Sequence, residues 1–335
     1  MCGIFDRLES ELPNFLPQEP PRPGLALEPV LPTITALAAR GVYLGTSSWK
    51  YPGWTRLVYT PERYEFRGEF SESRFNDRCL KEYAETFRAV GVDATYYTFP
   101  TEKFAAGLAA LVPEHFRFGF KVTDEITCNR FPKLPRFAER GGQPNPNFLN
   151  VELFLKQFLQ PLETIRPKVG IVMFEFSRFY APDFPRGRDF VAAVDRFLGA
   201  LPKDWRYGVE VRNRNLLRPE FFAMLSSHGV AHIFNQWSGG MSLEFQLAQA
   251  GCWTAPHSAA RLLIRPGNDY EECKRRLTPF DQMREPFPEA RLAAVEMIRT
   301  ALKRNSGPMF VFFGNKLEGS SVLSAKALVE ELGVR

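Results

Sequence analysis

Short apolar stretches recur along the chain from Val42 to Val334, and each is followed by a stretch in which apolar residues recur with helical spacing. Residues 170–174 and 309–313 are almost continuously apolar, which is typical of parallel strands covered on both faces. We predict eight strands, at residues 42–46, 92–98, 116–122, 169–176, 206–212, 230–235, 261–265 and 309–314. Eight strands that alternate with helices predict an α/β fold, a single closed (β/α)8 barrel of the TIM type.

The stretches between these strands have the spacing and boundaries of helices. In the first of them, apolar residues occupy the i, i+3, i+4 and i+7 positions of one helical face: Leu80, Tyr83, Ala84 and Phe87. Gly91 then supplies a stop signal. Similar apolar stripes occur at 154–159, 219–229 and 288–298.

Residues 1–40 differ from the rest of the chain. Seven prolines lie between Pro13 and Pro32, which argues against a regular helix or a central strand in this segment. We therefore predict a proline-rich N-terminal extension, either an extended arm or a disordered lead-in, followed by one barrel domain at 41–335. That length suits a barrel, which commonly uses about 250 residues, with several long loops.

Three connections are too long to be simple turns, at 47–75, 123–148 and 266–287, and each follows a predicted strand. In a parallel barrel, all three project from the face at the carboxyl ends of the strands, where active sites are built. Polar residues also gather at these strand ends: Lys121, Glu175, Glu210, Arg212, Asn235, Arg265 and Asn315. Both observations predict a functional site at the C-terminal mouth of the barrel.

Glu210 and Arg212 are the sharpest local signal. Alternation along a strand places them on the same side, about 7 Å apart. They form either a buried ion pair or a substrate clamp, in which Arg212 binds an anion and Glu210 serves as acid, base or hydrogen-bond acceptor. Lys121 is expected to bind an anion or pair with Glu210, and a Schiff base is the less favoured alternative.

Aromatic residues cluster just after the first predicted strand, where Trp49, Tyr51 and Trp54 lie within six residues. They predict either stacking on a flat ligand, such as a sugar or a base, or a hydrophobic plug at the end of the barrel. Arg265 and Asn315 end the seventh and eighth strands, and phosphate sites in this fold often use the loops after those strands.

The composition narrows the choice of partners and cofactors. A net charge of +5 suits an anionic ligand, and the longest basic stretch, residues 274–276, favours a solvated helix face over nucleic-acid binding. The chain has no glycine-rich nucleotide motif and only four histidines, so we predict no nucleotide cofactor and no metal. A Mg²⁺ held by Glu175 or Glu210 is the remaining alternative.

Five scattered cysteines without a Cys-x-x-Cys pair predict reduced thiols, and no apolar stretch approaches about 18 residues. We therefore expect a cytoplasmic protein without a membrane segment. The sequence does not identify a protein partner, and a partner bound through the proline-rich arm belongs to the alternative of a non-catalytic binding barrel.

Several motifs resemble those of the YecE-like proteins, also called domain of unknown function 72. They are Gly45-Thr-Ser-Ser-Trp-Lys-Tyr-Pro-Gly-Trp54, Thr95-Tyr-Tyr-Thr-Phe-Pro100, Phe118-Gly-Phe-Lys121, Gly208-Val-Glu-Val-Arg-Asn213 and Asn315-Lys-Leu-Glu-Gly319. A further element, beginning at Arg265-Pro-Gly, resembles a subgroup of the family. The resemblance extends from about Gly41 to the C-terminus.

This resemblance implies a TIM-type barrel and an enzyme whose reaction is unassigned. Its motif residues here are Trp49, Trp54, Tyr97, Lys121, Glu210, Arg212, Arg265, Asn315 and Gly319. The chain departs from the family pattern at Gly91, Asp93, Cys128, Leu216 and Gly314, where the family usually has Glu, Asn, His, Trp and Asn. These changes imply an altered specificity or a loss of catalysis.

Together these observations predict an enzyme that acts on a small anionic, phosphate-bearing substrate at the barrel mouth. Glu210 and Lys121 are the predicted catalytic residues, and the predicted substrate-binding residues are Trp49, Trp54, Tyr97, Arg212, Asn235, Arg265 and Asn315. The expected reaction is either a hydrolase or phosphodiesterase reaction, or an isomerase or lyase reaction on a phosphorylated substrate. The alternatives are a non-catalytic binding barrel and a nuclease-like phosphodiesterase that binds nucleic acid.

Overall fold

Eight parallel strands close into a barrel in the order β1-β10-β9-β8-β7-β6-β5-β4, in a computed structural model that describes residues 25–180, 182–305 and 307–333. The barrel strands are β1 (Val42–Thr46), β4 (Ala89–Val92), β5 (Arg117–Lys121), β6 (Val169–Phe176), β7 (Tyr207–Val211), β8 (Ala231–Gln236), β9 (Ser258–Leu262) and β10 (Met309–Phe313). The predicted (β/α)8 barrel is therefore confirmed.

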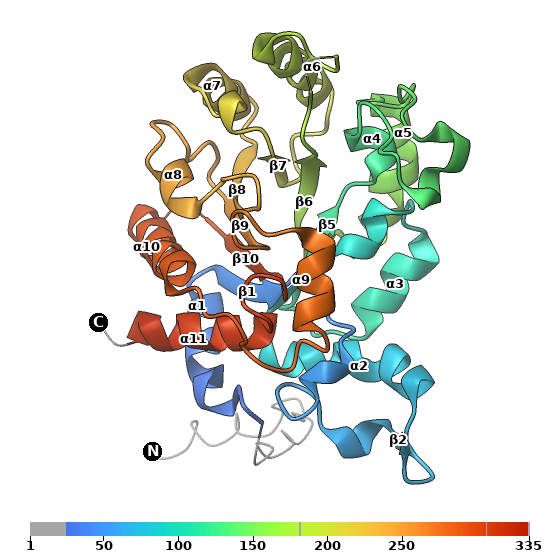
Figure 1. The fold of residues 1–335 in the computed structure, drawn as a ribbon, viewed down its shortest axis with the longest axis vertical. Helices are drawn as coiled ribbons and strands as arrows, with labels where there is room; N and C mark the ends of the chain where they lie inside the picture. Colours follow the sequence, from blue (N-terminus) through green and yellow to red (C-terminus); the bar gives the residue numbers. More distant parts are fainter. Residues whose placement is uncertain (1–24, 181, 306, 334–335) are drawn as a thin grey trace, which may run out of the picture.

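Helices surround the strands on the outside of the barrel (Figure 1). The α-helices of the described residues are α1 (Leu31–Ala39), α2 (Glu72–Thr86), α3 (Glu102–Ala110), α4 (Asp124–Thr127), α5 (Val151–Leu153), α6 (Gly187–Gly199), α7 (Pro219–Ser227), α8 (Leu243–Leu247), α9 (Tyr270–Leu277), α10 (Pro288–Arg304) and α11 (Ser321–Gly333). A hairpin of β2 (Glu65–Phe66) and β3 (Glu69–Phe70) lies within the first long loop.

Shorter helical segments fill much of the remaining connections. They are η1 (Glu28–Val30), η2 (Pro52–Trp54), η3 (Pro61–Tyr64), η4 (Asp93–Tyr96), η5 (Pro135–Arg140), the π-helical η6 (Phe154–Leu159), η7 (Gln160–Lys168) and η8 (Arg214–Leu216). The three predicted long loops therefore contain ordered local structure.

Two predicted strands are displaced along the sequence. The second was expected at 92–98 but is β4 (Ala89–Val92), because the chain turns into η4 (Asp93–Tyr96), where the Thr95 hydroxyl donates hydrogen bonds to the carbonyls of Val92 and Lys121. The seventh was expected at 261–265 but is β9 (Ser258–Leu262). Its apolar run continues past the strand end, so apolarity alone placed it three residues too late.

Residues 28–39 form η1 and α1, so the prediction that the proline-rich segment contains no regular helix is wrong for these residues, and the boundary at residue 40 stays a prediction. A proline is tolerated in the first turn of a helix, and α1 has one there. Ile34 and Leu37 of α1 are buried in the hydrophobic core, which anchors the helix to the barrel. Residues 1–24 lie outside the described residues.

The inside of the barrel is filled by side chains of unequal size. A Cβ added to Gly119 would lie 2.6 Å from the ring of Phe312, and one added to Gly208 would lie 2.7 Å from Ile233. Bulky side chains of some strands thus fill the space left by glycines of others. Together they form an apolar layer beneath the mouth: Ala89, Ile171, Met173, Ile233, Ala259, Phe310 and Phe312.

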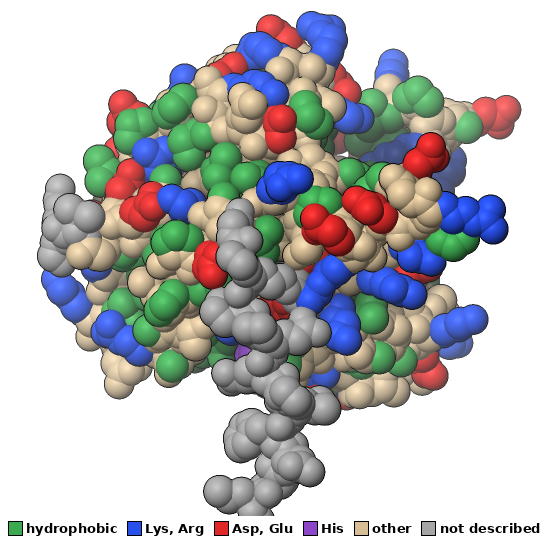
Figure 2. All heavy atoms as spheres, turned by 90° about the horizontal axis from the view of Figure 1, so that it is seen from below, with side chains coloured by type: hydrophobic (Ala, Val, Ile, Leu, Met, Phe, Trp, Pro, Cys, Tyr) green, Lys and Arg blue, Asp and Glu red, His purple; other side chains and the backbone are tan. Residues whose placement is uncertain are grey.

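On the face shown in Figure 2, basic and acidic side chains are interspersed rather than gathered into one basic stripe. Among the described residues, no helix is both long and apolar enough to cross a membrane. The cytoplasmic location stays a prediction.

Candidate functional site

A layer of charged residues lies directly above the apolar layer, because side chains two residues apart in a strand point the same way. In β6 the inward row is Ile171, Met173 and then Glu175, and in β9 Ala259 is followed by Arg261. Lys121 of β5 and Glu210 of β7 occupy the equivalent positions at the carboxyl ends of their strands. The fold therefore brings these side chains together at the mouth.

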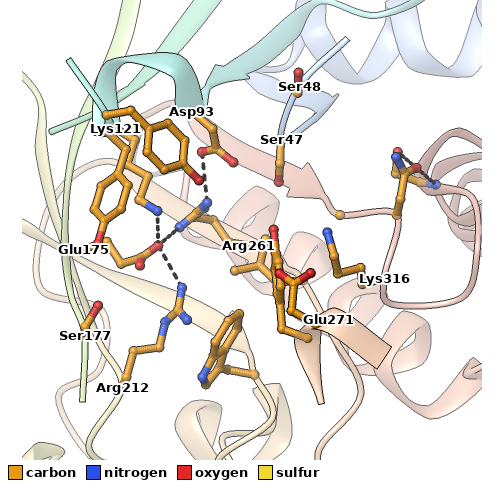
Figure 3. A pocket seen from close by; sticks show the side chains of 18 of the residues that line it. Ser47, Ser48, Asp93, Lys121, Glu175, Ser177, Arg212, Arg261, Glu271 and Lys316 are labelled. Carbon is orange, nitrogen blue, oxygen red and sulfur yellow. Dashed lines mark hydrogen bonds and ion pairs between the residues drawn. The ribbon is translucent and has the colours of Figure 1, made fainter. Parts of the chain in front are cut away.

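Glu175 is the centre of this layer. Its Oε2 atom accepts bonds from Lys121 Nζ at 2.7 Å, Arg212 Nη2 at 2.7 Å and Arg261 Nη1 at 2.6 Å (Figure 3). Burial alone would raise the pKa of Glu175, but Arg212, Lys121 and Arg261 outweigh it and lower that pKa. Glu175 is therefore ionised at neutral pH.

Glu210 is fully buried beneath the same cations. Its Oε1 atom accepts from Arg212 Nε at 2.8 Å and its Oε2 atom from Arg261 Nη1 at 2.7 Å. Arg261 also reaches Asp93 Oδ1 through Nη2 at 3.1 Å. Burial would lower the pKa of Arg261, but Glu210, Asp93 and Glu175 raise it well above its usual value.

These six residues form the charged network: Asp93, Lys121, Glu175, Glu210, Arg212 and Arg261. Its three carboxylates balance its three cations, which satisfies the requirement that buried charges be paired. Glu210 and Arg212 thus form the buried ion pair that was one of the two predicted alternatives. Asp93, whose side chain is 34% exposed, is the most accessible carboxylate of the network.

A cavity of about 460 Å³ opens above this network. Its charged lining residues are Asp93, Lys121, Arg136, Glu175, Arg212, Arg261, Glu271 and Lys316. Its aromatic lining residues are Tyr51, Tyr96, Tyr97, Trp237, Tyr270 and Phe313. The cavity thus combines charged groups at its floor with aromatic walls.

Two of the aromatic side chains are unusually exposed for their size, Tyr97 at 62% and Tyr270 at 45%. Trp237 lies beside Tyr270, with 6.4 Å between ring centroids, and the guanidinium carbon of Arg212 lies 3.3 Å from the centroid of the Trp237 ring. Lys121 Nζ lies 3.6 Å from the centroid of Tyr96. These rings orient the cations and leave aromatic surface for a ligand.

Lys316 differs from the cations of the network. Its half-buried side chain points into the cavity, with Nζ 3.9 Å from the centroid of the Tyr270 ring (Figure 3). It makes no ion pair within the part of the chain that the structure describes. Burial and the nearby Lys274 lower the pKa of Lys316.

Four of the predicted site residues line the cavity: Tyr97, Lys121, Arg212 and Asn315. Glu210 and Asn235 lie below it and are fully buried. Asn235 donates from Nδ2 to the carbonyl of Val211, so it joins neighbouring strands. The catalytic role predicted for Glu210 stays a prediction, and its position suits the orientation of the two arginines.

Three predicted binding residues are placed elsewhere. Trp49 and Trp54 belong to the hydrophobic core, and Trp54 stacks on Tyr59, so the plug alternative describes them better than exposed stacking. Arg265 donates to the carbonyl of Pro286 at 2.6 Å and is not among the cavity-lining residues. The misplaced seventh strand is the cause, because Arg261 holds the position assigned to Arg265.

Sequence reasoning missed Arg261, Trp237, Tyr270 and Lys316, and it treated Asp93 only as a departure from the family motif. Arg261 had a usable signal, since it follows Ala259 with the spacing of an inward row. Trp237 directly follows the sixth barrel strand, β8, so its position at a strand end was also visible in the sequence. Tyr270 and Lys316 lie in a helix and a loop that strand patterns do not describe.

Among the positions that depart from the family pattern, some line the cavity at the mouth and others do not. Gly314 lines the cavity, and a Cβ there would lie 3.1 Å from backbone atoms of Leu263. A Cβ at Gly91 would lie 3.2 Å from backbone atoms of Ser47. Cys128 and Leu216 are buried and do not line the cavity.

A carboxylate-held cation would have to compete with the existing pairs, because the oxygens of Glu210 and one oxygen of Glu175 already accept from lysine or arginine. Within residues 25–180, 182–305 and 307–333, no three His, Cys, Asp or Glu side chains are grouped to hold a metal ion.

Residues 43–335 match the family model described as "Protein of unknown function DUF72". The UPF0759 protein YecE of Escherichia coli K12 and that of Escherichia coli O157:H7 are each 24% identical to the chain over 183 residues, 54% of this chain and 50% of theirs. The chain thus spans about half the length of the curated relatives it matches.

Crystal structures of two DUF72 family proteins have a similar fold. The protein from Enterococcus faecalis V583 gives a TM-score of 0.60 at 17% identity, covering 88% of this chain and 98% of that chain. The protein from Thermotoga maritima MSB8 gives a TM-score of 0.56 at 21% identity, covering 87% and 98%. At these identities the likeness shows the fold alone.

Proposed function

We propose that this chain, which belongs to the DUF72 family, binds a small phosphate-bearing molecule in the cavity at the C-terminal mouth of its barrel and catalyses a reaction on it. The family membership predicted from the sequence motifs is confirmed by the match over residues 43–335. The activity and the substrate class are our proposal.

The observation that carries this proposal is the charge of the cavity wall. Five cationic side chains line the cavity against three carboxylates. The difference arises because Glu210 and Asp124, which pair with lining arginines, do not themselves line the cavity. The cationic groups therefore face a ligand directly, whereas two of the carboxylates that balance them lie behind the cavity wall, and in a partly enclosed site electrostatic attraction is stronger than in bulk water.

The size and walls of the cavity support a small molecule. Sites for such ligands span about 300–1,000 Å³, and this cavity measures about 460 Å³. Tyr97, Trp237 and Tyr270 offer aromatic surface to the organic part of a ligand. They take the place of the predicted stacking residues Trp49 and Trp54.

The distribution of proton-transfer groups favours an isomerase or lyase reaction on the phosphorylated substrate. Asp93 is partly exposed and makes one ion pair among the described residues, so within the charged network it is the carboxylate best placed to accept a proton from a ligand. Lys121 provides an ammonium group that can stabilise developing negative charge. Glu175 and Glu210 hold the cations in position.

The test measures the affinity of the full chain for ribose 5-phosphate and ribose by calorimetry, with product formation followed by NMR. We expect binding of the phosphorylated sugar only, weakened at least tenfold by Lys121→Ala, which removes one positive charge from the cavity wall and leaves Glu175 with one partner fewer, and unchanged by Lys103→Ala on the exposed face of α3. Asp93→Asn should abolish turnover of any substrate found. Equal binding by Lys121→Ala and the wild type would contradict the role of Lys121.

A non-catalytic binding barrel is the second candidate. The observation that favours it is the engagement of Glu175 and Glu210 by lysine and arginine, which leaves Asp93 as the accessible carboxylate of the network. A chain that binds phosphorylated molecules but turns over none of a broad panel would support this candidate over the enzyme.

A further inference from the structure

We infer that the ligand binds in one orientation, with its anionic group at the β10–α11 corner and its uncharged, hydroxyl-bearing part against Asp93. The β10–α11 corner is defined by Asn315, Lys316 and the first residue of α11, Ser321, all of which line the cavity. This inference deepens the proposed function and rests on it. It assigns the ligand to the class of phosphorylated sugars or polyols.

Charge is distributed unevenly around the cavity. The three cations of the charged network are already balanced by its three carboxylates, and Arg136 pairs with Asp124. Lys316 is the lining cation that makes no ion pair among the described residues. An anion at Lys316 gains a charge interaction without displacing an existing partner, whereas an anion at the network competes with Glu175.

Asn315 provides a second, independent sign of a ligand at this corner. It is only 5% exposed, and its Oδ1 atom accepts hydrogen bonds from the backbone N–H and the hydroxyl of Ser321, both at 2.8 Å. These bonds fix the orientation of the amide group. The Asn315 amide lies close enough to the Tyr51 hydroxyl to lower the pKa of Tyr51, yet its Nδ2 atom forms no hydrogen bond of normal geometry among the described residues, and a buried donor left without an acceptor is costly. An oxygen of a bound anion supplies that acceptor.

The start of α11 adds to the same field. This helix has 13 residues, and aligned peptide dipoles place partial positive charge at a helix N-terminus. Lys274, which lies close enough to Lys316 to affect its titration, contributes further positive charge, and Glu271 and Asp93, which act on Lys316 in the opposite sense, offset part of it. Helix, amide and ammonium groups therefore converge on one corner.

The corner is also held rigidly, which reduces the cost of binding. The N–H of Gly319 donates to the carbonyl of Asn315 at 2.8 Å, and the N–H of Leu317 donates to the carbonyl of Gly314 at 3.2 Å. Glu318 accepts bonds from Arg291 and from the backbone N–H of Phe287. The loop that carries Lys316 is therefore ordered before a ligand arrives.

The Asp93 side of the cavity has the opposite character. Its carboxylate faces the cavity with a 34% exposed side chain, and its charge raises the pKa values of Tyr51 and Tyr270, second to their burial. A carboxylate repels a phosphate but accepts hydrogen bonds from hydroxyl groups. The two sides of the cavity thus select a ligand with an anionic end and a hydroxyl-bearing end.

The test is a calorimetric titration of the full chain with inorganic phosphate and with ribose 5-phosphate. Lys316→Gln removes the charge, and Asn315→Asp keeps the oxygen that caps α11 while replacing the free donor by a carboxylate oxygen. We expect each variant to bind both probes at least tenfold more weakly than the wild type, a loss of about 1.4 kcal/mol. Lys103→Gln, a charge change on exposed α3, should bind both as the wild type does.

Asp93→Asn separates the two ends of the ligand. We expect it to weaken ribose 5-phosphate but not inorganic phosphate, and weaker phosphate binding would contradict the assigned orientation. Circular dichroism checks that every variant is folded, and Lys316→Arg should retain binding if charge is what matters.

The outcomes distinguish the two proposals. If the wild type binds neither probe, the proposed function fails together with this inference. If the wild type binds both probes and Lys316→Gln and Asn315→Asp bind equally well, the proposed function stands and the β10–α11 corner is wrong.

Discussion

The buried carboxylate of Glu210 offers the sharpest test of the charged network, through Glu210→Gln. Glutamine has nearly the same shape but leaves Arg212 and Arg261 without one of their counter-charges, and its amide N–H₂ group must face a guanidinium. Glu210 accepts bonds of 2.8 Å and 2.7 Å from these arginines and is fully buried, so water cannot compensate. Removing one partner of such a buried pair costs about 3–5 kcal/mol.

The free energy of unfolding should therefore fall by about 3–5 kcal/mol in urea denaturation followed by circular dichroism. An unfolding entropy of about 2.1 cal/mol/K per residue gives about 0.7 kcal/mol/K for the 335 residues, so the melting temperature should fall by roughly 4–7 °C. Glu271→Gln is the matched control, because Glu271 lines the cavity but is exposed and makes no ion pair in the part of the chain described. Its effect should stay within about 0.5 kcal/mol. A free energy of unfolding for Glu210→Gln within about 1 kcal/mol of the wild-type value would refute the reasoning.

Three further predictions concern other residues. Because the pKa of Glu175 is lower in the folded chain than the unfolded value of about 4.3, its ionised form stabilises the fold above that pH, and this contribution is lost as pH falls through the folded pKa. The free energy of unfolding of Glu175→Gln, measured by urea denaturation at a series of pH values, should therefore fall less steeply on acidification than that of the wild type. Equal dependence on pH in the two proteins would contradict this. Trp54→Ala should cost about 3–5 kcal/mol of stability because it empties a buried site, while ribose 5-phosphate affinity measured on the folded chain should stay within about twofold. Arg265→Gln should leave the calorimetric affinity for inorganic phosphate unchanged, since Arg265 does not line the cavity. A tenfold loss of affinity would indicate that Arg265 takes part in binding.

Much of the fold follows from the apolar pattern, because a barrel strand covered on both faces must be apolar over several consecutive residues. The strands at 42–46 and 169–176 were predicted with their observed bounds. The pattern fails where an apolar run extends beyond the strand, as at Leu263 and Ile264, which are apolar but follow the end of β9. That displacement is why Arg265 was chosen in place of Arg261.

The candidate site was less accessible to sequence reasoning than the fold. Strand ends identified Lys121, Glu175 and Arg212 because alternation fixes the direction of each side chain. The partners of each charge depend on which strands face one another across the barrel, and no local pattern contains that information. The exposed aromatic surface, Tyr97 excepted, comes from residues whose neighbours are set by loop geometry, such as Tyr270.

The apolar and charged layers of the barrel constrain how this sequence can diverge. Arg261 contacts acids that follow or belong to three other strands, Asp93, Glu175 and Glu210. A lineage that loses one of these acids is left with an almost completely buried base that lacks part of its counter-charge. Inherited changes at the mouth should therefore arrive as compensating pairs, an acid with a base, drawn from segments that are distant in the gene.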